Sequence, residues 1–93
     1  MSAPTIAKFR LGRIVATAHA VEVIPNEDVL AAICRHQAGD WGQLCEEDRL
    51  ENERSLKEGF RLLSAYQSAR GVRFYVITEA DRSSTTVLLP EDY

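Results

Sequence analysis

The stretch FRLLSAYQSARGVRFYVITEADRSSTTVLLP, from Phe60 to Pro90, decides the fold of this chain. It holds three runs rich in β-branched and aromatic residues, at 60–67, 72–78 and 85–89. Two short polar segments, SARG and EADRSS, separate these runs. Strands joined by such short turns pair antiparallel, so the stretch predicts a three-stranded β-meander. The middle run is apolar at four successive positions, 74–77, which favours a central strand.

The first part of the chain predicts one more strand and a pair of helices. FRLGRIVA, 9–16, reads as a strand with a bulge at Gly12, where the apolar alternation slips. Thr17 is a suitable cap for a short helical turn, which Pro25 ends. Asn26 is then predicted to be the N-cap of a second helix, which ends at Gly39 and carries an apolar stripe with Leu30.

The segment from about Leu44 to Glu58 predicts a third helix, ended by Gly59, with few apolar positions. The chain of 93 residues fits one domain, 1–93, with the element order β-α-α-α-β-β-β. We therefore expect an α+β fold, in which two to three helices pack on one face of a small antiparallel sheet. That sheet consists of the C-terminal three-stranded meander plus the N-terminal strand. A domain this small has a modest core, so we expect no cofactor and no small-molecule substrate.

The bulk composition indicates a cytoplasmic protein. No apolar run approaches the roughly 20 residues that span a membrane. The first residues lack the apolar region of a signal peptide. The two cysteines, Cys34 and Cys45, are too few for a disulfide framework, and we expect them to be reduced and partly buried.

Metal binding and nucleophilic catalysis receive little support. Cys34 and His36 are two positions apart on a predicted helix, where side chains do not face each other, and no C-x₂-C pair is present. The serines at 83 and 84 lack a G-x-S-x-G context. We therefore predict no metal site. A small metal-independent ribonuclease remains an alternative, with His36, Glu79 and Arg82 as base, acid and phosphate-binding cation.

The net charge of −3 lies in one segment. Residues 46–58 hold six acids against three bases, a difference of −3, and the two flanking parts of the chain are each neutral. An acidic chain without a basic stripe is a poor match to nucleic acid, because phosphate contacts supply most of that affinity. Spaced carboxylates on a helix are attracted to a basic protein surface, although a charge run is also typical of a solvated helix face.

Five segments cover most of the chain: FRLGRIVAT (9–17), RHQAGDWG (35–42), EEDRLENERSLKEG (46–59), RLLSAY (61–66) and VITEADRSSTTVLLPEDY (76–93). In these segments the chain resembles small "plasmid-related" or hypothetical proteins of bacterial plasmids, integrative elements and phages. The resemblance implies an accessory protein of mobile DNA. Small accessory proteins of that kind include inhibitors of host defence such as anti-CRISPR proteins, which block a nucleoprotein complex by occupying its surface.

The functional expectation is therefore a non-enzymatic binding protein that inhibits a host defence complex such as CRISPR–Cas. Its partner would be a host protein or ribonucleoprotein complex, and no membrane partner is expected. A regulatory or antitoxin-type partner protein is a further alternative. The chain itself is expected to be a monomer or an edge-strand dimer. The predicted contact residues are charged and come from several elements: Arg10, Arg13, Arg35, Glu46, Glu47, Asp48, Glu51, Arg73 and Arg82.

The run EADRSSTT, 79–86, has a position between two strands that predicts a turn rather than an active site. Asp81 and Ser83 are residues that bond their own backbone in turns. A bare turn tolerates many sequences, whereas this run is specific to the resemblance. We therefore predict a mutual hydrogen-bonded network of the Glu79, Asp81 and Arg82 side chains.

Overall fold

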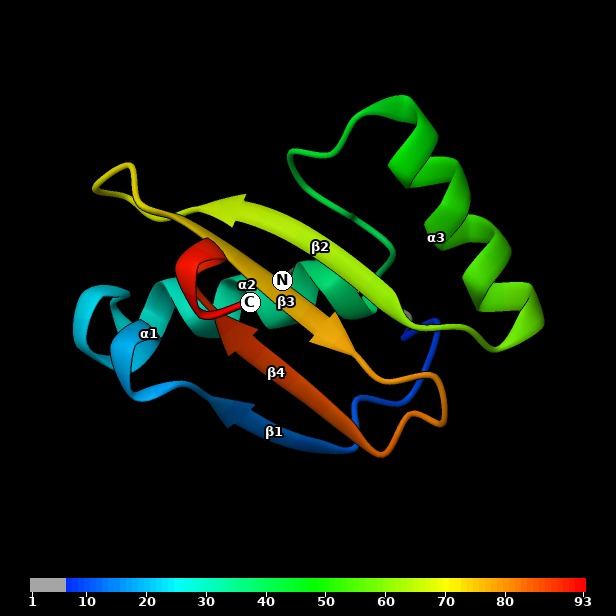
Figure 1. Cartoon of the computed structure of the whole chain (residues 1–93), viewed down its shortest axis with the longest axis horizontal. Helices are drawn as coiled ribbons and strands as arrows, with labels where there is room; N and C mark the ends of the chain where they lie inside the picture. Colours follow the sequence, from blue (N-terminus) through cyan, green and yellow to red (C-terminus); the bar gives the residue numbers. More distant parts are fainter. Residues whose placement is uncertain (1–6) are drawn as a thin grey trace, which may run out of the picture.

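The computed structural model describes residues 7–93 and contains the predicted elements in the predicted order (Figure 1). Its elements are β1 (Arg13–Ala16), α1 (Ala18–Val23), α2 (Asn26–Gln37), α3 (Glu46–Glu58), β2 (Leu62–Gln67), β3 (Arg73–Thr78), β4 (Ser84–Leu88) and the short 3₁₀ helix η1 (Pro90–Asp92). Thr17 caps α1 as predicted, since its hydroxyl accepts the Ala20 N–H. The fold class is α+β.

The four strands form one sheet in the order β1-β4-β3-β2. β2 pairs with β3, and β3 with β4, both antiparallel, which confirms the meander and the central position of β3. β1 joins the sheet beside β4 but runs parallel to it. The prediction of a purely antiparallel sheet is therefore wrong for this strand. No tight turn links β1 to β4, so local sequence does not set their relative direction.

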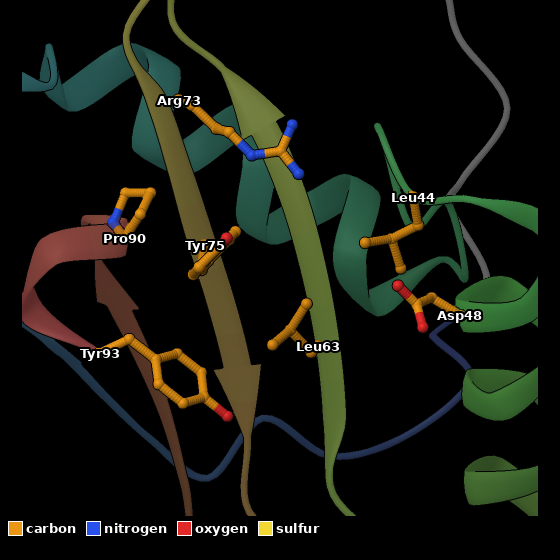
Figure 2. Close-up of a pocket in the computed structure, with 7 residues that line it drawn as sticks. All are labelled: Leu44, Asp48, Leu63, Arg73, Tyr75, Pro90 and Tyr93. Carbon is orange, nitrogen blue, oxygen red and sulfur yellow. The ribbon is translucent and has the colours of Figure 1, made fainter.

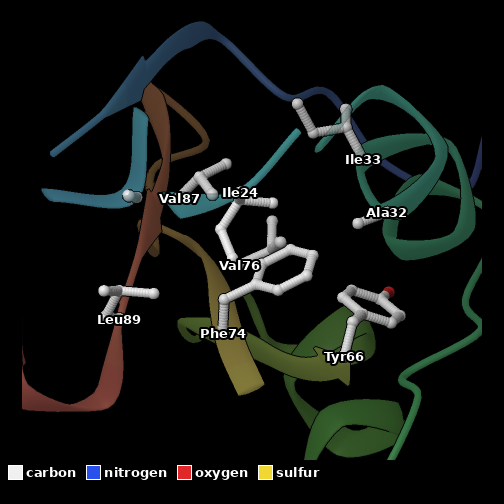
Figure 3. Close-up of a cluster of buried hydrophobic side chains, with 9 residues drawn as sticks. Ile24, Ala32, Ile33, Tyr66, Phe74, Val76, Val87 and Leu89 are labelled. Atoms are coloured by element: carbon white, nitrogen blue, oxygen red, sulfur yellow. The ribbon is translucent and has the colours of Figure 1, made fainter. Parts of the chain in front are cut away.

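The hydrophobic core lies between the sheet and the two helices α1 and α2 (Figure 3). Phe74 and Val76 of β3 point into it, next to Val87 of β4. Ile24, just after α1, and Ile33 of α2 cover these side chains from the other side. The two helices therefore pack on one face of the sheet, as the sequence predicts.

The third helix, α3, lies along the outer edge of β2 rather than over a face. Its buried Asn52 pairs with the backbone of Leu63: the side-chain amide donates to the Leu63 carbonyl at 2.7 Å, and its oxygen accepts the Leu63 N–H at 3.1 Å. The segment 41–43 covers the next part of this edge, where the Ala65 N–H donates to the Trp41 carbonyl and the Ala65 carbonyl accepts the Gln43 N–H. The β2 edge is thus closed.

Several local predictions need correction. β1 begins at Arg13 rather than residue 9, because Gly12 has a φ of 65° and turns the chain before the strand instead of forming a bulge within it. The N-cap of α2 is Pro25, and Asn26 is the first helical residue. Leu30, predicted in the apolar stripe of α2, is 57% exposed, because the helix turns Ala32, Ile33 and His36 to the core instead.

The two cysteines are free and exposed, so the prediction of partial burial is wrong. Cys34 lies on the outer surface of α2, and Cys45 is the N-cap of α3. None of the helices in residues 7–93 has the length and apolar character required to cross a membrane.

Candidate binding surface

The sheet face opposite α1 and α2 carries no helix in the described residues, and only η1 folds back in front of it (Figure 1). Strand alternation presents Leu63, Tyr75, Ile77, Thr86 and Leu88 to this face. Between α3 and η1 the face forms an open hollow of about 470 Å³ (Figure 2). Its lining combines apolar, aromatic and charged side chains: Leu44, Asp48, Leu63, Arg73, Tyr75, Pro90 and Tyr93. We call this the open-face hollow.

Tyr93 separates the open-face hollow from a smaller one of about 210 Å³. Its ring meets the Tyr75 ring edge-on, with 6.1 Å between ring centroids. The Arg61 guanidinium donates to the Tyr93 hydroxyl at 2.7 Å and lies 5.8 Å from the ring centroid. These contacts hold an exposed aromatic side chain above the sheet, in a position from which it can contact a partner.

The C-terminal sequence LLPEDY fixes the position of Tyr93. Leu89 is buried in the core and is the N-cap of η1. Asp92 accepts hydrogen bonds from the Thr17 hydroxyl at 2.9 Å and from the Leu89 N–H at 3.4 Å. Partial desolvation alone would raise the pKa of Asp92, but these hydrogen bonds and the contact with His19 outweigh it and lower the pKa. The last turn is therefore attached to the sheet and to the start of α1.

The acidic residues of α3 fall into two groups. Glu58 forms an ion pair with Arg54 at 2.7 Å, and Glu53 accepts the Trp41 indole N–H at 2.8 Å. Within residues 7–93, the other four acids form no ion pair, and all four are exposed: Glu46, Glu47, Asp48 and Glu51. Asp48 lines the open-face hollow, and both Asp48 and Glu51 line a further hollow beside it. Two of the four unpaired carboxylates of α3, those of Asp48 and Glu51, are thus next to the open face.

The nine predicted contact residues do not form one surface. Asp48, Glu51 and Arg73 lie around the open face, and Glu46 and Glu47 are exposed in the first turn of α3. Arg10 and Arg13 are exposed at the other end of the sheet order, before and within β1. Arg35 and Arg82 are engaged in internal contacts, described next.

Arg35 belongs to the structure of the GDWG loop, 39–42. Its guanidinium pairs with Asp40 at 2.7 Å, and this hydrogen bond lowers the pKa of the Asp40 carboxyl. The guanidinium also lies over the Tyr66 ring, 4.8 Å from its centroid. The Tyr66 hydroxyl donates to the Asp40 carbonyl at 2.6 Å, and burial raises its pKa to about 12. The loop also approaches β2 so closely that only glycine fits at position 42, since an added Cβ atom would stand 2.0 Å from the Ala65 carbonyl oxygen.

Arg82 clamps the turn between β3 and β4 to the end of α3. Its guanidinium donates to four backbone carbonyls, those of Phe60, Glu79, Ala80 and Ser55, at 2.7–3.2 Å. Asp81 instead accepts the Ser83 N–H at 2.9 Å, as predicted for a turn residue. The predicted mutual network of the Glu79, Asp81 and Arg82 side chains is therefore wrong. The backbone carbonyls, whose positions the sequence does not reveal, take the place of the two carboxylates.

His36 is fully buried within a chain of polar contacts that crosses the sheet. Its Nδ1 lies 2.5 Å from the Ser64 hydroxyl and its Nε2 lies 2.8 Å from the Thr78 hydroxyl. The Thr78 and Thr85 hydroxyls are 2.7 Å apart, and the Thr85 hydroxyl donates to the Leu11 carbonyl at 2.7 Å.

The directions of these hydrogen bonds fix the tautomer of His36. A carbonyl only accepts, so the single Thr85 proton goes to Leu11, and Thr78 must donate to Thr85. Thr78 then accepts from His36, which carries its proton on Nε2, while Nδ1 accepts from Ser64. Burial, aided by the charge of Arg82, lowers the pKa of His36 to about 4.

The three residues of the ribonuclease alternative, His36, Glu79 and Arg82, do not form an exposed site together. Both His36 nitrogens are engaged in the interior, Arg82 donates to backbone carbonyls, and Glu79 is exposed. Within residues 7–93, no three His, Cys, Asp or Glu side chains are grouped so that they could hold a metal ion.

The residues that sequence reasoning missed are the uncharged ones around the open face and Arg61. Leu63 and Tyr75 alternate with core residues along β2 and β3, so alternation in the meander was the signal that pointed to them. Nothing in the sequence indicates that Tyr93 folds back onto Tyr75. Comparison of the chain with known proteins found no matching family model, no matching curated protein and no matching solved structure.

Proposed function

We propose that this chain is a non-enzymatic binding protein that contacts a protein partner through the open face of its sheet. The observation that carries the proposal is the open-face hollow, which Tyr75 and Tyr93 line together with Asp48 of α3 and with Arg73. Protein interfaces are enriched in tyrosine and arginine, which anchor a contact while surrounding polar groups set specificity.

The charges favour a basic segment on the partner. Asp48 and Glu51 lie on the side of α3 that borders the open face, whereas the other two unpaired acids, Glu46 and Glu47, line neither hollow there. Opposite charge on the partner would steer association and fix orientation. The apolar floor, Leu63 and Tyr75, would take an apolar or aromatic side chain of the same segment.

The proposed partner is a host defence nucleoprotein complex such as CRISPR–Cas, whose surface the chain would occupy. This part of the proposal rests on the resemblance to accessory proteins of mobile DNA described above. Proteins that hold nucleic acid present basic surfaces, and Asp48 and Glu51 at the open face are complementary to such surfaces. A regulatory or antitoxin-type protein would use the same surface with a different partner.

The test compares two substitutions that change charge equally on one turn of α3. Asp48→Lys reverses a charge that lines the open-face hollow, whereas Glu46→Lys reverses one that does not. Plasmid interference by a CRISPR–Cas system is measured in cells that express each variant, alongside binding of the purified chain to the purified effector complex. We expect the unaltered chain and Glu46→Lys to bind and to reduce interference, and Asp48→Lys to lose both effects.

Two results would contradict the proposal. If the unaltered chain neither binds nor inhibits any defence complex, the proposed partner is wrong. If the two lysine variants behave alike, the open-face hollow is not the contact surface. Labelled RNA incubated with the chain tests the ribonuclease alternative, which requires cleavage that His36→Ala abolishes.

A further inference from the structure

Within residues 7–93, one edge of the sheet is covered by other segments and the other edge is not. The outer edge of β2 is covered by Asn52 and by the segment 41–43. The outer edge of β1 pairs with no other segment in residues 7–93. Natural sheets protect such an edge with charges, proline or a covering segment. The centre of β1 instead presents Ile14 and Val15, which are 50% and 38% exposed.

The hydrogen bonds of β1 show which backbone groups are free. The Arg13 N–H donates to the Ser83 carbonyl at 2.9 Å, and the Thr17 N–H donates to the Val87 carbonyl at 3.0 Å. In a parallel ladder, alternate residues of a strand bond to the neighbouring strand. Arg13, Val15 and Thr17 therefore face β4, and Ile14 and Ala16 direct their N–H and C=O groups to the open edge. The edge offers two donors and two acceptors.

We propose that this edge pairs with the same edge of a second copy of the chain, antiparallel, with the two-fold axis at Val15. In this register, Ile14 exchanges two hydrogen bonds with the partner's Ala16, and Ala16 does so with the partner's Ile14. All four outward groups are then paired, and the two sheets become one continuous sheet of eight strands.

The side chains are self-complementary in this register. The large Ile14 stands opposite the small Ala16 of the partner. Val15 meets the partner's Val15 in a non-hydrogen-bonded pair, where cross-strand side chains are closest. Arg13 stands opposite the partner's Thr17, so no like charges face each other. In a two-fold dimer the same patch of both copies meets, so that patch must be complementary to itself. Pairing with a strand of a different protein would not require this self-complementarity.

Other two-fold registers fit less well. An axis between Ile14 and Val15 would place Val15 opposite Ile14, but the Val15 backbone already faces β4. An axis at Ile14 would require outward bonds from Gly12, whose φ of 65° takes it out of the extended conformation. Only four residues form the strand, so the predicted dimer is small and reversible.

The experiment measures the oligomeric state of the full chain by sedimentation over a range of concentrations, together with amide exchange. We expect a reversible monomer–dimer equilibrium in the unaltered chain. The Ile14 and Ala16 amides should become protected only as the dimer forms, and those of Arg13 and Val15 should be protected throughout.

Substitutions at the axis make the test specific. Val15→Lys and Val15→Glu each place like charges opposite each other, so each should raise the dissociation constant at least tenfold. Mixing the two variants should restore association as a heterodimer, which a misfolded variant could not do. Leu30→Lys is the matched control, since Leu30 is equally apolar, is exposed on α2, and should leave the equilibrium unchanged.

A chain that remains monomeric at its highest attainable concentration overturns the proposal. Protection of Ile14 and Ala16 that does not depend on concentration also overturns it, because that result assigns the edge to another segment of the same chain. Dimerisation of Val15→Lys with unchanged affinity would show that the copies meet elsewhere. None of these outcomes depends on whether the open-face hollow binds a partner.

Discussion

At the residue scale, His36 shows how a titratable side chain becomes part of a core. Both ring nitrogens are bonded to hydroxyls from β2 and β3, and the rings of Phe9 and Trp41 lie edge-on to it at 5.1 and 5.8 Å. No buried side-chain nitrogen or oxygen in residues 7–93 lacks a hydrogen-bond partner. A polar group placed this way stabilises the fold only while it stays neutral.

The depressed pKa of His36 predicts acid sensitivity. The imidazole takes up its proton near pH 6.5 in the unfolded chain but only near pH 4 in the folded one, so the unfolded state binds more protons between these values. The stability that neutral His36 provides is complete above pH 6.5 and is lost as the pH falls to 4. At about 1.4 kcal/mol for each pH unit between pH 6.5 and pH 4, the loss of unfolding free energy approaches about 3.5 kcal/mol.

The measurement is urea unfolding of the unaltered chain and of His36→Gln from pH 7.5 to pH 4. Glutamine keeps a donor for Thr78 and an acceptor for Ser64 but does not titrate. The difference in unfolding free energy between the two proteins should therefore shrink as the pH falls. Parallel pH curves for the two proteins would refute the predicted role.

Gly42 illustrates a close backbone approach that only glycine permits. An added Cβ would stand 2.0 Å from the Ala65 carbonyl oxygen, and Gly42 has a φ of 75°. We expect Gly42→Ala to lower the unfolding free energy by about 3 kcal/mol or more, since both clash and backbone strain contribute. Gly59→Ala is the control: its φ is 77°, but no atom lies within 4 Å, so it should cost about 1–2 kcal/mol. Equal losses would show that the approach of Gly42 to β2 is not required.

At the scale of elements, the sequence predicted what short-range patterns determine. The meander, the cap of α1 and the end of α3 at Gly59 follow from alternation, turn residues and caps within a few positions. The parallel direction of β1 and the place of α3 at the sheet edge depend on contacts between distant segments. Asp48, Glu51 and Arg73 of the candidate binding surface were predicted from the sequence, but Tyr93 was not, because its place depends on the path of the last turn.

The pairing of Asn52 with Leu63 predicts that one side chain protects the β2 edge. Asn52→Ala would leave a backbone N–H and C=O without their partner, so the unfolding free energy should fall by about 2 kcal/mol. Asn52→Asp should lower the unfolding free energy further, because a carboxylate cannot donate and would place a buried negative charge against the Leu63 carbonyl oxygen. Urea unfolding gives the free energies, and exchange of the Leu63 amide reports the edge directly. Leu50→Ala, at an exposed position of α3, should change neither; an unchanged Leu63 amide in Asn52→Ala would contradict the prediction.

At the scale of the whole molecule, the last residues of the chain hold its first elements in place. β4 pairs with β1, and Thr17, directly after β1, donates to Asp92, 75 positions later. The same last turn places Tyr93 over Tyr75 at the open face. One short segment therefore supports both the closure of the fold and the proposed contact surface, while the edge of β1 lies apart from that surface.

This arrangement predicts coupling between Thr17 and Asp92. Asp92→Ala removes the acceptor for the Thr17 hydroxyl and for the Leu89 N–H, so we expect the unfolding free energy to fall by about 1 kcal/mol. Glu91→Ala is the matched control, because Glu91 is exposed and has no hydrogen bond in the described residues, and it should change stability by less than about 0.5 kcal/mol. A double-mutant cycle with Thr17→Val separates the direct bond from loss of the turn. Strictly additive effects of Thr17→Val and Asp92→Ala would mean that the Thr17–Asp92 hydrogen bond does not stabilise the fold, and would leave the 3.4 Å contact of Asp92 with His19 as the link between the last turn and α1.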